Sequence, residues 1–182
     1  MSLRFAVEPL RSVREDVDRI GRQHWAETEG YHAGQQYNPD WNRYFSMDEG
    51  GWFFVGTARD DAGRMVGYVG CYVMPSMHSQ AIVAMEDFFF LEEGHRQGWN
   101  AIRFLRFIEQ ECRRRGAVEI GFTDKRGKGL ILERTGYKVV AQQYSKNLSG
   151  PSARQQSGAD STTPATVVEA VPDVRTVTAA SA

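Results

Sequence analysis

The chain has 182 residues, of which 41% are hydrophobic and 25% are charged, a composition typical of a globular protein with a sizeable core. Its net charge of −1 gives no overall field that would favour nucleic acid or an acidic membrane. Cys71 and Cys112 lack CxxC spacing, and no 18 apolar residues run together. We therefore expect a soluble, cytoplasmic protein with reduced thiols and no membrane or nucleic-acid partner.

The N-terminal third predicts one strand followed by two helices. Residues 3–10 form the opening strand, and Ser12 with Glu15 has the spacing of a capping box at the start of the first helix. One face of that helix gathers apolar and aromatic side chains: Val13, Val17, Ile20, His24 and Trp25. A short second helix over 38–51 has an aromatic inner face: Trp41, Tyr44 and Phe45.

Three consecutive strands are predicted next. They cover residues 51–60, 64–74 and 80–91, and the DDAG between the first two is a hairpin signal. The third strand is apolar enough to be central in its sheet. We expect these strands to form an antiparallel meander.

A helix over 101–116 follows, with an apolar face of Ile102, Leu105, Ile108 and Cys112. It ends in RRRG, three arginines suited to the negative end of the helix dipole and then a glycine. A strand over 117–123 then has Val118, Ile120 and Phe122 on one face. A short helix over 128–136 and a last strand over 137–148 complete the order, which predicts an α/β (mixed α+β) fold with helices on both faces of a mixed sheet.

The composition changes sharply at residue 149. Residues 149–182 contain no aromatic residue, leucine, isoleucine or methionine, and they are rich in Ala, Ser, Thr and Pro. Such a segment cannot bury enough apolar surface to offset its ordering entropy. We predict a domain over 1–148 and a low-complexity tail over 149–182, which is either disordered or docks on a protein partner through ATVVEAVPDVRTV.

Two segments carry a resemblance to a known family. EDFFFLEEGHRQGWNAIRFLRFIEQECRRRGA joins a strand, a glycine-bearing loop and a helix, and LILERTGYKVVAQQYSKNL joins a short helix to Gly-Tyr-Lys and a strand. Together with the element order, they resemble the GNAT superfamily of acetyl-CoA-dependent N-acetyltransferases over roughly residues 3–148. The ending GYK…YSKNL is especially similar to phage-encoded members. The resemblance implies a GNAT-like, mostly antiparallel central sheet, acetyl-CoA as co-substrate, and a primary amine of a small molecule or peptide as acceptor.

The resemblance places the cofactor pyrophosphate at the loop before the helix over 101–116. The family pattern Arg/Gln-x-x-Gly-x-Gly/Ala puts its first, fourth and sixth positions on His95, Gly98 and Asn100, so only the fourth matches. A helix N-terminus offers unpaired N–H groups, and glycine allows close approach of a phosphate. The implied cofactor-binding residues are Phe88, Phe89 and Phe90 for the pantetheine, and His95, Arg96, Gln97, Gly98, Trp99 and Asn100 for the pyrophosphate.

A carboxylate on the central strand would deprotonate the acceptor amine. Glu86 and Asp87 lie where family members often place this base, and their side chains point to opposite faces of a strand. The resemblance favours Glu86 as the catalytic residue; a structural ion pair with an arginine is the alternative. The family's tyrosine general acid falls on Leu132, so the usual acid is absent.

Three further features are the aromatic connection between the first two helices, the histidines and two basic runs. Tyr31, His32 and Tyr37, in GYHAGQQYN, are candidate substrate-binding residues. The four histidines share no metal-ligand spacing, so no metal site is predicted. The basic run at 113–115 is expected to end a helix, and that at 125–128 to lie in a solvated loop.

Two functions stay open from the sequence. The first is N-acetyl transfer from acetyl-CoA, which the fold favours. The second is a GNAT-fold structural or adaptor protein, such as a phage virion component held through its C-terminal tail. The changed loop positions and the missing tyrosine favour this second function, and virion association would then replace the cytoplasmic location.

Overall fold

The computed structural model describes residues 2–28, 35–124, 130–141 and 146. The chain divides into two units, Met1–Val139 and Val140–Ala182, and every helix and strand described below belongs to the first. The predicted boundary between 148 and 149 lies outside the described residues and stays a prediction. In chain order the elements are β1 (Arg4–Glu8), α1 (Leu10–Thr28), α2 (Trp41–Glu49), β2 (Phe53–Arg59), β3 (Met65–Pro75), β4 (Ile82–Leu91), the 3-10 helix η1 (Glu93–His95), α3 (Asn100–Arg114), β5 (Glu119–Gly121) and α4 (Leu130–Arg134).

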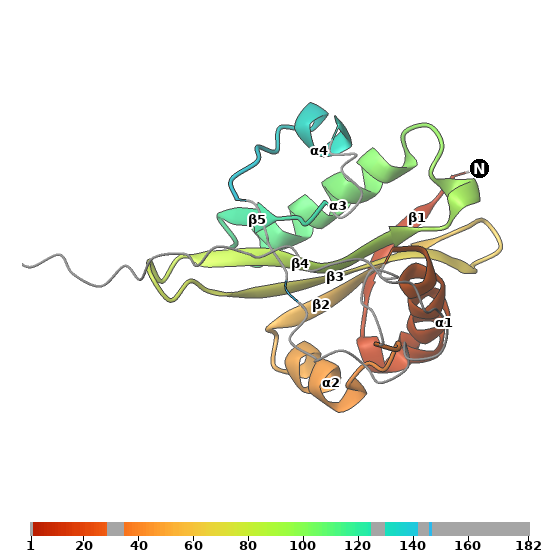
Figure 1. The fold of residues 1–182 in the computed structure, drawn as a ribbon, viewed down its shortest axis with the longest axis horizontal. Coiled ribbons are helices and arrows are strands. Elements are labelled where there is room, and N and C mark those ends of the chain that lie inside the picture. The colour runs from red at the N-terminus through yellow and green to blue at the C-terminus, as the bar shows by residue number, and fades with distance from the viewer. Residues whose placement is uncertain (1, 29–34, 125–129, 142–145, 147–182) are drawn as a thin grey trace, which may run out of the picture. The chain divides into compact units, whose positions relative to one another are not determined.

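The five strands form one sheet in the order β1-β2-β3-β4-β5. The first three pairings are antiparallel, and β5 lies parallel to β4 after the crossover through α3. Helices α1 and α2 lie on one face of the sheet and α3 on the other (Figure 1). This confirms the predicted mixed, mostly antiparallel sheet with helices on both faces.

The α3 face of the sheet carries one apolar core. Phe104 and Ile108 of α3 are fully buried there against Phe54 and Val69 of the sheet, and the Phe5 ring stacks on Phe104 at 5.0 Å. Of the predicted inner face of this helix, Leu105, Ile108 and Cys112 are buried and Ile102 is half-buried; Phe104 is an addition. Cys71 and Cys112 lie buried in this core as free thiols, as the sequence predicted.

The opposite face carries a second core under α1 and α2. Val13, Val17 and Ile20 of α1 are buried there, together with Phe45 of α2 and Phe53 of β2. Each helix thus presents an apolar face at helical spacing to the sheet, which is why the periodicity located both helices correctly.

The capping box predicted at Ser12 and Glu15 is wrong. Helix α1 begins at Leu10, whose N–H donates to Asp48 Oδ2 at 2.8 Å, and Ser12 lies inside the first turn. The Ser12 hydroxyl donates to the Pro9 carbonyl at 2.7 Å instead of accepting from the helix. A carboxylate from α2, distant in sequence, therefore replaces the local cap.

The C-terminal part of the first unit is less regular than predicted. Strand β5 has only three residues, and Val118, predicted to share a face with Ile120, lies before the strand and is 76% exposed. Residues 137–141, the start of the predicted last strand, contain no strand, and the rest of that prediction falls on residues 142–148, of which only Lys146 is described. The basic run at 113–115 does end α3: Arg114 and Arg115 both pair with Glu111 at 2.7 Å.

Candidate functional site

Strands β4 and β5 diverge one residue after their short pairing. Their registered pairs are Val83 with Glu119, Ala84 with Ile120 and Met85 with Gly121, and the described residues contain no pair beyond these. The next side chain on β4, Glu86, accepts a hydrogen bond from the Thr123 N–H at 3.1 Å. The Glu86 carboxylate therefore spans the opening between the two strands at its narrow end.

A β-bulge follows at Asp87. Gly70 of β3 is registered with Phe88 and Cys71 with Glu86, so Asp87 is the extra residue on β4. The bulge turns Asp87 toward α2, where Tyr44 donates its hydroxyl to Asp87 Oδ2 at 2.5 Å. Glu86 and Asp87 thus serve different surroundings, as the alternation along a strand predicted.

Two tyrosines define the surroundings of Asp87. Burial raises the pKa of Tyr44, and the neighbouring Asp87 charge raises it further. The pKa of Tyr72 is raised by burial and then by the same carboxylate. Both phenols therefore stay protonated at neutral pH and act as hydrogen-bond donors beside a carboxylate.

The loop between β4 and α3 ends in an open helix N-terminus. Gly98 adopts φ +64°, a conformation that favours glycine, and no atom lies within 4 Å of the position a Cβ would take. The first N–H groups of any helix have no intrahelical partner, and at α3 the N-cap side chain makes no hydrogen bond to them. The Asn100 side chain donates to the His95 carbonyl at 3.2 Å, which closes residues 95–100 into a turn.

The side chain of Arg96 leaves this turn toward α1. Its Nε donates to the Leu91 carbonyl at 2.5 Å, its Nη2 pairs with Glu27 Oε2 at 2.5 Å, and its guanidinium lies 4.9 Å from the centre of the Phe90 ring. Trp99 is 69% exposed on the loop. Arg96 is thus held by protein groups, whereas the main chain of Gly98 and Asn100 and the Trp99 ring border the open helix end.

The predicted substrate-binding residues divide into two groups. Tyr31 and His32 lie outside the described residues. Tyr37 packs on α1 against Gly21 and Trp25, whose ring centre lies 6.3 Å away, and burial raises its pKa to about 12. The position of the missing family tyrosine, Leu132, is on α4, and its carbonyl accepts the N–H of Tyr137 at 3.0 Å.

Sequence reasoning missed three contributors to this region. Tyr44 was assigned to core packing and Tyr72 to a strand, although together they surround Asp87. Glu27, the partner of Arg96, was assigned no role. The only sequence signal for the first two was the concentration of tyrosine between residues 31 and 72, and no signal marked Glu27.

Within the described residues, no group of three metal-ligating side chains gathers. No helix in that part of the chain is long and apolar enough to cross a membrane.

Solved structures share this architecture. An aminoglycoside acetyltransferase from an uncultured soil metagenomic sample superposes with a TM-score of 0.65 at 15% identity, covering 82% of this chain and 100% of its own. The chain has the GNAT acetyltransferase fold. A ribosomal-protein-alanine N-acetyltransferase from Brucella melitensis gives 0.61 at 15% identity, covering 81% and 99%. A GNAT family acetyltransferase from Staphylococcus aureus gives 0.60 at 16% identity, covering 81% and 100%.

The sequence itself matches no family model and no curated protein. At these identities, the likeness concerns the GNAT fold and leaves the activity to be argued from the residues of the site.

Proposed function

We propose that this GNAT-fold protein is an acetyl-CoA-dependent N-acetyltransferase. The observation that carries the proposal is the coincidence of three features along β4: the divergence from β5 after Met85, the bulge at Asp87, and the open N-terminus of α3 beyond Leu91. An extended ligand with a phosphate at one end and a thioester at the other would meet all three.

The residues of the loop fit a pyrophosphate through their main chain. The uncapped first turn of α3 supplies N–H donors and the positive end of the helix dipole. The open space beside Gly98 leaves room for a phosphate at the main chain. The Asn100 side chain donates to the His95 carbonyl, and this contact turns it away from the space beside Gly98.

The free edge of β4 fits the pantetheine arm. From Glu86 onward this edge has no strand partner among the residues described, so Phe88 to Phe90 can offer main-chain groups there. The bound co-substrate would supply an acetyl thioester. Glu86, at the narrow end of the opening, would accept the proton of the attacking amine, and N–H groups on β4 would polarise the carbonyl.

The Asp87 surroundings fit the acceptor. A carboxylate flanked by two protonated tyrosines attracts an ammonium group by charge. Two of the solved structures reported above are named for their acceptors, an aminoglycoside and a ribosomal-protein alanine, and both acceptors present an amine. We propose a primary amine of a small molecule or peptide as the acceptor class.

Isothermal titration calorimetry with coenzyme A tests this proposal. Wild-type protein should bind with a Kd below about a millimolar, and Gly98→Glu should weaken binding at least about ten-fold, because it places a negative charge and a strained φ at the phosphate position. Gly116→Glu is the matched control, since Gly116 has φ +85° and open space at the opposite end of α3. The absence of heat with the wild type at millimolar coenzyme A would contradict the proposal.

A second candidate function is a GNAT-fold adaptor without transfer activity. The specific observation in its favour is that Arg96 is held by Glu27 and the Leu91 carbonyl, while Leu132 occupies the position of the family's acid. Docking of the 149–182 tail on a protein partner, and a phage virion as the location, belong to this second proposal. Wild-type protein that fails to bind coenzyme A would favour it over the first.

A further inference from the structure

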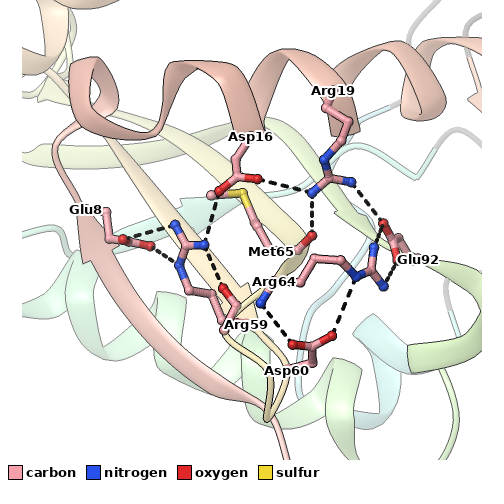
Figure 2. A network of polar contacts seen from close by, with 9 residues as sticks. Glu8, Asp16, Arg19, Arg59, Asp60, Arg64, Met65 and Glu92 are labelled. Carbon is pink, nitrogen blue, oxygen red and sulfur yellow. Dashed lines mark hydrogen bonds and ion pairs between the residues drawn. The ribbon is translucent and has the colours of Figure 1, made fainter.

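Helix α1 contacts the loop between β4 and α3 at two points. At the first, Glu92 accepts from both Nη atoms of Arg64, at 2.8 and 2.7 Å, and pairs with Arg19 of α1 at 3.3 Å (Figure 2). The Glu92 side chain is only 14% exposed, whereas those of Arg64 and Arg19 are 49% and 43% exposed, so the carboxylate is the shielded member of these pairs. Glu92 directly precedes η1, and its N–H donates to the Val66 carbonyl at 2.8 Å.

A wider polar network supports this first point. Arg19 also donates to the Met65 carbonyl at 2.7 Å and pairs with Asp16, and Asp16 accepts from Arg59 at 3.1 Å (Figure 2). The start of the loop is therefore tied to α1 and to the β2–β3 hairpin at once.

At the second point, Glu27 pairs with Arg96 at 2.5 Å. Arg96 also donates to Leu91, the last residue of β4, and lies over the Phe90 ring. One guanidinium thus connects the end of α1, the end of β4 and the middle of the loop. Its planar fork donates from two separate nitrogens, Nε and Nη2, whereas a lysine ammonium would have to make both hydrogen bonds from one nitrogen.

The two points have opposite polarity. Helix α1 offers a cation at Arg19 and an anion at Glu27, eight residues apart, and the loop offers an anion at Glu92 and a cation at Arg96. Residues eight apart lie about two turns apart along a helix and about 80° apart around it, so both can face the same neighbouring loop. A shift of the loop along α1 would bring like charges together, so this pattern selects one position of the loop.

We propose that Arg96 and Glu27 are positioning residues that hold the loop in the conformation competent for the cofactor pyrophosphate. The inference rests on the proposed acetyl-CoA binding and deepens it. The phosphate would be bound by main-chain N–H groups of the loop and α3, while the Arg96 guanidinium pairs with Glu27 of α1. The affinity for the cofactor then depends on a carboxylate of α1 that does not touch it.

The physical basis is preorganisation. A loop that adopts the competent conformation for only a fraction of the time binds with an apparent Kd raised by the inverse of that fraction. Arg96→Ala removes the hydrogen bond to Leu91, the pair with Glu27 and the packing on Phe90 together. We expect the Kd for coenzyme A to rise about ten-fold.

Four variants test the inference by calorimetry with coenzyme A and by amide hydrogen exchange of residues 92–100 without ligand. Arg96→Ala and Glu27→Arg should each weaken binding and speed exchange, and the double variant Glu27→Arg/Arg96→Glu should recover part of both. Arg96→Lys should fall between the wild type and Arg96→Ala. Arg113→Ala, which removes an exposed guanidinium that pairs with Glu109 at the far end of α3, is the control and should change neither the affinity nor the exchange rate.

The outcomes separate the two proposals. Wild-type protein that does not bind coenzyme A overturns the proposed function and this inference with it. Wild-type protein that binds, with Arg96→Ala binding equally well and exchanging equally slowly, overturns only the inference. Loss of binding in Arg96→Ala without any recovery in the double variant would also overturn it, since the pairing with Glu27 would then not matter.

Discussion

Glu86 and Asp87 are neighbours in sequence with separate surroundings. Glu86 lies at the divergence of β4 and β5, where Thr123 donates to it, and Asp87 lies on the α2 side, where Tyr44 donates to it. The alternation of side chains along the strand produces this separation, and the bulge at Asp87 then brings Phe88 to the same face as Asp87, where both contact Tyr44. A proton acceptor and an ammonium-binding carboxylate can therefore stand side by side on one strand.

The two carboxylates should differ in steady-state kinetics. With an amine that the wild type acetylates, Glu86→Gln should lower kcat by about 10²-fold through loss of the base. Asp87→Asn should mainly raise the KM for the amine, by about ten-fold, through loss of a charge-assisted contact. Thiol release from acetyl-CoA measures both.

Glu119→Gln is the control for these variants, since Glu119 is an exposed carboxylate on β5 beside the same strands. It should behave as the wild type. The reverse pattern, with kcat lost in Asp87→Asn and KM raised in Glu86→Gln, would exchange the two roles. Equal activity in all three variants would remove both carboxylates from the mechanism.

For single residues, the sequence alone points to those that belong to a local pattern. Glu86, Asp87 and Gly98 were considered because each occupies a recognisable place in a strand or loop, and the roles given to Glu86 and Gly98 stay predictions. Tyr44 and Glu27 were not assigned to the site, because their roles depend on contacts 43 and 69 residues away in the chain. Periodicity within one element carries no information about such pairs.

Among the elements, the pairing of β3 with β4 does most to shape the site. Gly70 faces Phe88 across the bulge, and a Cβ there would lie 2.6 Å from Phe53 Cζ and closer still to Phe88 Cζ. The Phe88 ring cannot move aside easily, because it stacks on Tyr68 at 4.4 Å. A glycine is thus needed at this position for space.

Gly70→Ala should therefore destabilise the protein by about 1 to 3 kcal/mol, the usual range for an added methyl group in a packed core. Urea denaturation measures the change. Gly94→Ala is the matched control, since no atom lies within 4 Å of its Cβ position, and it should be close to neutral. If Gly70→Ala proved as stable as the wild type, the bulge would not have the packing described.

Helices and strands themselves were largely predictable. Helices α1, α2 and α3 repeat apolar residues at the helical period, and β2, β3 and β4 are apolar runs bounded by turn residues. The failures arose where distant groups compete with local signals. Asp48 caps α1 in place of the predicted Ser12, and β5 pairs with β4 for only three residues before the two diverge. The bulge itself depends on cross-strand register, which no single segment reveals.

For the whole molecule, the likeness to solved structures establishes the fold and not the reaction. The architecture agrees with that of known GNAT acetyltransferases at identities of 15 to 16%, and most of each neighbour is covered. A shared fold does not by itself establish a shared reaction. The proposed cofactor site is therefore local, since β4, its open edge beside β5 and the N-terminus of α3 would together hold one cofactor.

Amide chemical-shift mapping during a titration with coenzyme A tests this claim most directly. We predict saturable shifts at Phe88 to Phe90, at Gly98 to Asn100 and at Thr123, with the surface of α1 around Arg14 unchanged. Saturable shifts confined to other parts of the molecule, or no shifts at millimolar coenzyme A, would contradict the account.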